Sequence, residues 1–201
     1  MHRMPLRLRK AALCLAIATT ASAAQAQGAP SDSDSAANHD HGPGRLDLTV
    51  GAGYLGSPGA YGEAFSTGLR LAIHRGFAVS LDLGYGLLNA PPIDEDRWWV
   101  IPSIAVVIPA GRATFDFGGG LGVGTASGYA SWSTYFARPF DPTWALTAPA
   151  ARAHATLAYT LSPRLAVFVR PEIASLLAAS RPRITDTTWV GLVLGFETRL
   201  L

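Results

Sequence analysis

The chain has 201 residues, of which 16 are Lys or Arg, 14 are Asp or Glu, five are His and one is Cys. This length suffices for one domain or one small barrel. Residues 1–26 contain four of the basic residues and no acid, so the remainder has twelve bases against fourteen acids, a net charge of −2. Such a balance gives no support to nucleic-acid binding. The single cysteine, Cys14, also lies in residues 1–26, so disulfides and cysteine chemistry are excluded from the rest.

Residues 1–26 have the pattern of a secretory signal peptide. The first ten positions contain four basic residues and no acid, an apolar run extends from Ala11 to Ile17, and Ala24-Gln25-Ala26 provides small residues around a cleavage site. We expect cleavage near Ala26 and export through the inner membrane.

Residues 27–44 are predicted to form a disordered periplasmic lead-in because they are polar and rich in Gly, Pro and Ser. His39 and His41 flank Asp40 within it, but a flexible tail without further ligands gives no specific metal site. No metal or other cofactor is predicted anywhere in the chain.

From residue 45 onward, apolar and polar side chains alternate with a period of two, which predicts β-strands because successive side chains point to opposite faces. We expect eight strands, over residues 45–54, 63–74, 76–87, 97–109, 111–125, 148–161, 164–174 and 188–201. Only the fourth is apolar on both faces, so its phase is left open, and Pro102 within it removes one ladder hydrogen bond.

The predicted connections alternate between short and long. Arg75, residues 109–111 and residues 162–163 form the short ones, and residues 55–62, 88–96, 126–147 and 175–187 form the long ones. Alternation of this kind is typical of outer-membrane barrels, whose periplasmic turns are short and whose outer loops are long. Strands of about ten residues cross a bilayer when tilted, and an even number can close without a free edge. The predicted fold is therefore all-β, an eight-stranded antiparallel up-and-down transmembrane barrel over residues 45–201.

The polar faces of these strands predict a charge-balanced interior. The residues assigned to it are Asp47, Arg70, Asp82, Asp116, Arg152, His154, Arg170, Glu172, Glu197 and Arg199. Buried charges persist when they are paired, so we expect a side-chain-filled interior rather than an open diffusion pore.

Aromatic side chains at the strand ends are predicted to mark the membrane borders. They are Tyr54, Phe65, Tyr85, Trp98 and Trp189 at the outer ends, and Phe77 and Tyr159 at the inner ends. A soluble secreted barrel, with these rings in its core, is the alternative that the same period allows.

The third long connection is rich in aromatic residues, more than a solvated loop needs. They are Tyr129, Trp132, Tyr135, Phe136, Phe140 and Trp144. We expect this loop either to cover the barrel mouth or to contact a partner of unknown identity or lipid headgroups. The acidic run Asp94-Glu95-Asp96 is expected at the tip of the second long loop. The default interpretation is a solvated loop, and the alternative is a site for a divalent cation that bridges lipopolysaccharide.

From about Arg45 to Leu201 the chain resembles the eight-stranded OmpA/OmpX-type outer-membrane barrel proteins. The features that match are the leader, the eight alternating strands, the order of short and long connections and a strand at the C-terminal end. The resemblance implies a location in the bacterial outer membrane, and outer-membrane lipids, lipopolysaccharide and the barrel assembly machinery as partners. The chain ends in Leu200-Leu201, whereas such barrels usually end in an aromatic residue that this machinery reads.

The predicted role is therefore non-enzymatic, structural or in surface interaction through the outer loops. Two alternatives stay open. A membrane-embedded lipid-modifying enzyme, such as a lipid A acylase or deacylase, would use His154 with Thr156 and an acid, but both side chains are predicted to point inward. A narrow gated channel is the other. The glycine-rich run 118–124 lacks the following helix of a nucleotide-binding loop.

Overall fold

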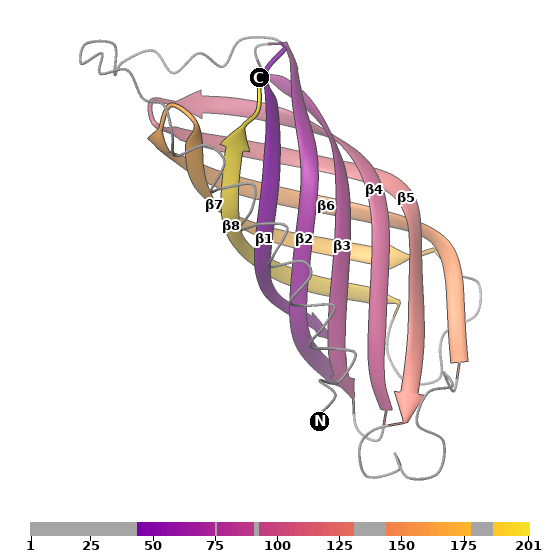
Figure 1. The fold of residues 1–201 in the computed structure, drawn as a ribbon. Helices are drawn as coiled ribbons and strands as arrows, with labels where there is room; N and C mark the ends of the chain where they lie inside the picture. The colour runs from indigo at the N-terminus through magenta and orange to yellow at the C-terminus, as the bar shows by residue number, and fades with distance from the viewer. Residues whose placement is uncertain (1–43, 75, 91–92, 131–143, 178–186) are drawn as a thin grey trace, which may run out of the picture. The chain divides into compact units, whose positions relative to one another are not determined.

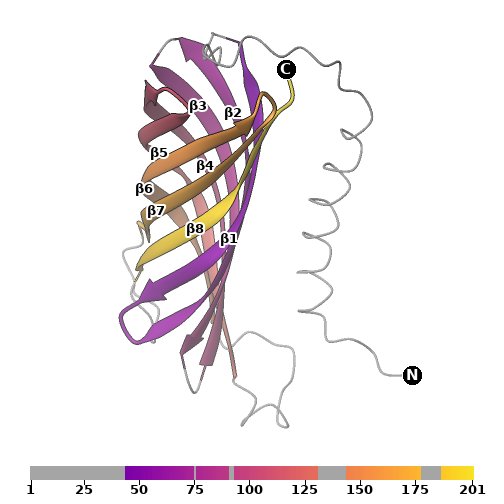
Figure 2. The same cartoon turned by 90° about the vertical axis from the view of Figure 1, so that its left-hand side faces the viewer.

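The computed structural model of the protein describes residues 44–74, 76–90, 93–130, 144–177 and 187–201. The eight strands in these ranges are β1 (Leu46–Ser57), β2 (Ala60–His74), β3 (Phe77–Ala90), β4 (Ile93–Ala110), β5 (Ala113–Ala130), β6 (Trp144–Ser162), β7 (Leu165–Leu176) and β8 (Thr188–Arg199). Each strand pairs antiparallel with the next along the chain, and β8 pairs with β1, so the sheet closes into a barrel (Figures 1 and 2). The described residues include no helix that could span a membrane.

The number, order and pairing of the strands confirm the predicted all-β, eight-stranded antiparallel barrel. Several strands extend further toward the long connections than predicted, and this corrects two of the expected loops. β1 and β2 are joined by Pro58 and Gly59 alone, and residues 91–92 separate β3 from β4. Gly59 has a φ of 80°, and Pro followed by a Gly of positive φ is the combination that a type II turn requires. Most residues of these two expected loops therefore belong to the paired strands and extend the hydrogen-bonded ladders of β1 with β2 and of β3 with β4.

The acidic run predicted at a loop tip is part of this extension. Asp94, Glu95 and Asp96 lie within β4, so the expectation of a solvated loop is wrong for them. In the strand, successive side chains point to opposite faces. Glu95 is buried in the interior, 1% exposed, whereas Asp94 and Asp96 are only partly covered.

The structure gives the phase of β4, which polarity leaves open. Trp99, Ile101 and Ser103 point into the barrel and are buried, whereas their neighbours Trp98 and Val100 are each 45% exposed on the outer face. The pairing of β4 with β5 skips Ile101 and Pro102, because proline has no N–H to donate to the ladder. The strand stays in register on both sides of this gap.

The outer face is apolar along all eight strands. On β2 to β8 many leucine, valine, isoleucine and phenylalanine side chains are 37–70% exposed there, as at Leu121 on β5 and Leu194 on β8, and the outward Leu48 and Val50 of β1 are half-buried. A closed sheet with an apolar outer face satisfies its backbone internally, which is the condition for a sheet in lipid.

Glycines on the inner face leave room for large side chains from neighbouring strands. Gly84 of β3 lies beside Trp99 of β4, and a Cβ at this glycine would overlap the indole ring. Gly51 and Gly195 similarly leave room for the ring of Phe168, whose Cζ would lie 3.1 and 2.7 Å from the added Cβ atoms. The glycines of the inner face thus provide the space that the large side chains of neighbouring strands occupy.

Gly84→Val tests this match between glycine and tryptophan. We expect the substitution to lower the free energy of unfolding by about 1–3 kcal/mol, because extra methyl groups in a filled core force side chains off their rotamers. The measurement is denaturant unfolding of the refolded barrel in lipid vesicles. Gly56→Ala is the control, because the nearest atom to an added Cβ is Val190 Cγ2 at 3.8 Å. Equal stability of the two variants would contradict the packing described here.

Candidate functional site

An ionic network fills the interior at the end of the barrel that has the termini and the β2–β3, β4–β5 and β6–β7 turns. We call this end the short-turn end, and the network is the first of two interior layers. Arg70 of β2 bridges two acids, with Nη2 2.8 Å from Asp116 Oδ2 and Nη1 3.2 Å from Glu197 Oε2. Arg45 joins the same group, since its guanidinium lies 2.7 Å from Asp47 Oδ1 and 2.9 Å from Glu197 Oε1. Four strands, β1, β2, β5 and β8, therefore meet through their charges inside the barrel.

A second ionic group surrounds Asp82 of β3. Arg152 Nη2 donates to Asp82 Oδ2 at 2.5 Å, and Arg170 Nη1 donates to Asp82 Oδ1 at 3.2 Å. Glu172 lies 3.6 Å from Arg152 Nη1 and 3.5 Å from Arg170 Nε. The serines Ser66, Ser80 and Ser103 complete the group as hydrogen-bond partners of Arg170, Asp82 and Arg152.

The predicted interior residues lie on the inner face, and nine of the ten take part in the ion pairs just described or line the polar cavity beside them. Eight are in ion pairs, namely Asp47, Arg70, Asp82, Asp116, Arg152, Arg170, Glu172 and Glu197. The ninth, His154, lines the cavity. Arg199 pairs in register with Asp47 at the end of β8. Sequence reasoning missed Arg45, because a residue at the first position of a strand shows no alternation on its N-terminal side.

A small polar cavity lies between the two ionic groups. Its volume is about 30 Å³, and its lining includes Arg70, Asp116, His154 and Thr156. His154 Nδ1 and Asp116 Oδ1 are buried and have no hydrogen-bond partner among the described residues. A water needs about 10–15 Å³ of such space and two to four polar partners, so the cavity suits about two water molecules.

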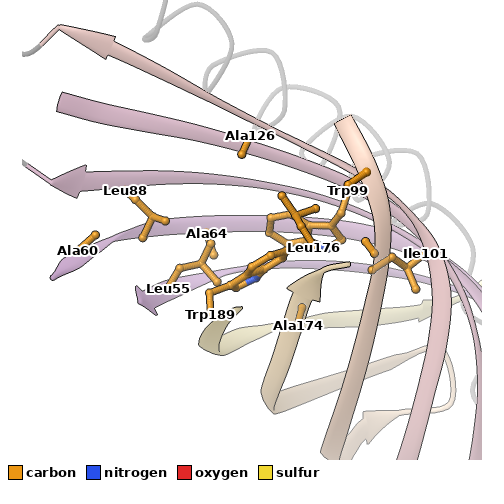
Figure 3. Close-up of a cluster of buried hydrophobic side chains, with 12 residues drawn as sticks. Leu55, Ala60, Ala64, Leu88, Trp99, Ile101, Ala126, Ala174, Leu176 and Trp189 are labelled. Atoms are coloured by element: carbon orange, nitrogen blue, oxygen red, sulfur yellow. The ribbon is translucent and has the colours of Figure 1, made fainter. Parts of the chain in front are cut away.

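The other end of the interior is apolar, which the prediction of an ionic interior did not foresee. Its described members are Leu55, Ala60, Ala64, Leu88, Trp99, Ile101, Ala126, Ala148, Ala150, Ala174, Leu176 and Trp189, together with the partly buried Leu146. The exposed fraction of Ile101 is 0% and that of Trp189 is 1%. Leu55, Trp99, Leu176 and Trp189 converge on one another from different strands (Figure 3).

One ion pair lies next to this apolar layer. Arg97 pairs with Glu95, and each is 1% exposed. The Arg97 guanidinium carbon lies 4.8 Å from the ring centroid of Trp189, whose ring in turn lies 5.6 Å from that of Trp99. A cation over an indole face is attracted by the ring quadrupole, so the charge is retained inside an otherwise apolar layer.

Trp189 corrects one of the predicted border aromatics. Val190 and Leu192 of β8 face outward and are 57% and 48% exposed, so the alternation directs Trp189 inward. The tryptophan is a core residue of the apolar layer and not a membrane-border residue. The sequence alone could have shown this, because the alternation in β8 places Trp189 on the face opposite to Val190 and Leu192.

The remaining predicted border aromatics lie on the outer face of the barrel. Phe65, Tyr85 and Trp98 occupy one register row across β2, β3 and β4, and the rings of Tyr85 and Trp98 are 4.3 Å apart. Tyr54 is 73% exposed near the same end. Phe77 and Tyr159 are 52% and 46% exposed near the short turns.

Most of the predicted aromatic loop falls outside the described residues. Trp132, Tyr135, Phe136 and Phe140 belong to residues 131–143, so their predicted contacts stay predictions. The backbone of Tyr129 lies in β5 and that of Trp144 in β6. No group of three or more His, Cys, Asp or Glu side chains suited to a metal ion occurs in the described part of the chain.

Known structures with the same fold were found by comparison. Neisserial surface protein A superposes with a TM-score of 0.63 at 12% sequence identity, over 78% of this chain and 97% of that chain. The outer membrane protein OprG from Pseudomonas aeruginosa gives 0.54 at 12% identity, over 81% and 98%. The chain has the fold of the small eight-stranded outer-membrane β-barrels.

A third similar structure is that of Ail, the attachment invasion locus protein of Yersinia pestis, solved with the heparin analogue sucrose octasulfate. It gives a TM-score of 0.52 at 14% identity, over 79% of this chain and 99% of that chain. No family model and no curated protein matches the sequence. At these identities the likeness concerns the fold, so the function has to be argued from the barrel itself.

Asp82→Asn tests the ionic network. The asparagine keeps the size of the side chain but removes the carboxylate that lies nearest to both Arg152 and Arg170, and we expect a loss of about 3–5 kcal/mol in the free energy of unfolding. The measurement is unfolding by guanidinium chloride in lipid vesicles, followed by tryptophan fluorescence. Glu63→Gln, which removes an exposed acid, should change stability by about 0.5 kcal/mol or less. A Asp82→Asn barrel as stable as the Glu63→Gln barrel would contradict the network.

Proposed function

We propose that the protein is an outer-membrane barrel with a filled interior that does not conduct solutes and that acts through its outer loops, in a structural or surface-interaction role. The observation that carries the proposal is the apolar layer inside the barrel, in which Ile101, Trp99, Trp189 and Leu176 are 0–2% exposed. An ion that crosses this layer would have to give up its water among apolar side chains, and the charges of the one ion pair beside the layer, Arg97 with Glu95, already neutralise each other.

The orientation in the membrane follows from the two ends of the barrel. The termini of the barrel and the two-residue turns that join β2 to β3, β4 to β5 and β6 to β7 lie at one end, which we assign to the periplasm. The opposite end has the two longest connections, between β5 and β6 and between β7 and β8, together with the two-residue connections that follow β1 and β3. The row of Phe65, Tyr85 and Trp98 then lies at the outer membrane border, where amphipathic rings are enriched.

The enzyme alternative receives less support from the site. A lipid-modifying enzyme needs its reactive groups open to the lipid, whereas His154 and Thr156 line an interior cavity. His154 Nδ1 has no hydrogen-bond partner among the described residues, so the described part of the chain holds no assembled histidine–acid relay at this position.

Conductance in planar lipid bilayers tests the filled interior. We expect the refolded wild-type barrel to show no steady open channel, because the apolar layer closes the path. The double variant Trp99→Ala/Trp189→Ala removes the two largest side chains of that layer and should raise the frequency of openings. Stable openings of the wild type, unchanged in the double variant, would contradict the proposal and favour the narrow channel.

A further inference from the structure

Basic residues gather at the end of the barrel where the short turns lie. We define the short-turn rim as the described residues 44–46, 73–74, 76–78, 109–114, 160–166 and 198–201. It contains Arg45, His74, Arg112, Arg164 and Arg199, and none of these described residues is an acid. Arg112 and Arg164 are exposed, and each occupies the turn between two strands. Arg75, next in sequence to His74, lies outside the described residues.

Backbone hydrogen bonds connect these basic residues around the rim. Thr160 N donates to Arg112 O at 2.8 Å, which joins the β4–β5 turn to the end of β6. Arg199 N donates to Arg164 O at 3.0 Å, which joins the β6–β7 turn to the end of β8. Arg112 and Arg164 therefore lie in successive turns at the same end of the barrel, and each turn is hydrogen-bonded to the end of the next strand along the rim.

The rim lies directly beyond the apolar outer face. Phe115 is 40% exposed on that face and follows Arg112 by three positions toward the barrel middle, a distance of about 10 Å along a strand. Tyr159, 46% exposed, pairs in register with Ala113 beside Arg112. A guanidinium at this height lies outside the hydrocarbon, at the level of the lipid headgroups, with a tyrosine at the border between them.

The chemistry of the rim fits a phosphate. Apart from Lys10 in the leader, every Lys or Arg position of the chain is arginine. Arginine presents a planar fork of donors that matches phosphate oxygens in pairs, whereas lysine acts as a point charge. Arg45 uses its guanidinium on Asp47 and Glu197 in the interior, and the exposed Arg112 and Arg164 extend into solvent.

We propose that the short-turn rim binds the phosphate headgroups of anionic phospholipids through Arg112 and Arg164. The assignment of these lipids to the periplasmic leaflet rests on the orientation given under the proposed function. Anionic headgroups near a membrane surface contribute attraction for each arginine, so the lipids around this rim should differ in composition from those around the opposite rim.

Native mass spectrometry of the mature protein with added phosphatidylglycerol or phosphatidylcholine tests the proposal. We expect phosphatidylglycerol to bind more tightly to the wild type. The double variant Arg112→Gln/Arg164→Gln should weaken the first phosphatidylglycerol by about five-fold for each arginine, and leave phosphatidylcholine unchanged. Altered mobility on an unboiled gel establishes that each variant is folded.

The matched control is Arg112→Lys/Arg164→Lys, which keeps the charge and removes the fork, and should retain an intermediate preference. A wild type without headgroup preference, or a Gln variant that keeps it, would overturn the proposal. The acidic lead-in, with Asp32, Asp34 and Asp40, is the competing occupant. If the preference for phosphatidylglycerol appeared only after residues 27–43 were deleted, the rim would bind that segment in the intact protein. This result would overturn the proposal that the rim binds phospholipid.

An independent experiment separates this result from the proposed function. A tag inserted between Pro58 and Gly59 should be detected by antibody on intact cells, and a tag between Gly111 and Arg112 should not. The reverse labelling would overturn the proposed orientation and the periplasmic leaflet, whereas the headgroup measurement on the purified protein does not depend on it.

Discussion

The closure of β8 on β1 is the interaction on which the rest of the structure depends. Pairs run from Asp47 with Arg199 to Gly56 with Val190, so neither strand is left with a free edge. In a bilayer no water is present to satisfy an open edge, and each unpaired backbone group would cost several kcal/mol. Closure also creates the interior: it brings Glu197 of β8 to Arg45 and Arg70, residues that are far apart in the sequence. The ionic network thus forms only when the barrel closes, and its ion pairs in turn stabilise the closed barrel.

The interior is filled in two layers, one of paired charges and one of apolar side chains. Near the short turns, paired charges fill the space and leave a cavity suited to about two water molecules. At the opposite end, tryptophans and aliphatic side chains fill it, and glycines such as Gly84 on the adjacent strand give them room. An ionic layer specifies which strands meet because each charge needs its own partner, and an apolar layer excludes water. The combination explains how a narrow barrel is filled from a sequence with so many glycines.

Alternation of polar and apolar residues predicted the strands, their number and most interior charges, because a period of two is a local property. It did not predict the strand ends, since Pro58 and Gly59 close a tight turn where a longer loop was expected. The phase of β4 could not be read from polarity, because Trp98 and Trp99 are alike in hydrophobicity and only packing against Gly84 assigns Trp99 to the interior. The apolar layer depends on contacts between distant strands, and Trp189 was therefore misassigned to the membrane border. The role of the outer loops has no local signature of this kind.

The central claim is that the chain forms a closed barrel in the outer membrane. Electrophoresis of an outer-membrane fraction, with and without boiling, tests it most directly, because closed barrels keep their hydrogen-bonded sheet in detergent until they are heated. The account predicts that the protein is found in this fraction and that the unboiled band migrates differently from the boiled band. A protein recovered in the soluble fraction, with the same migration before and after boiling, would contradict it.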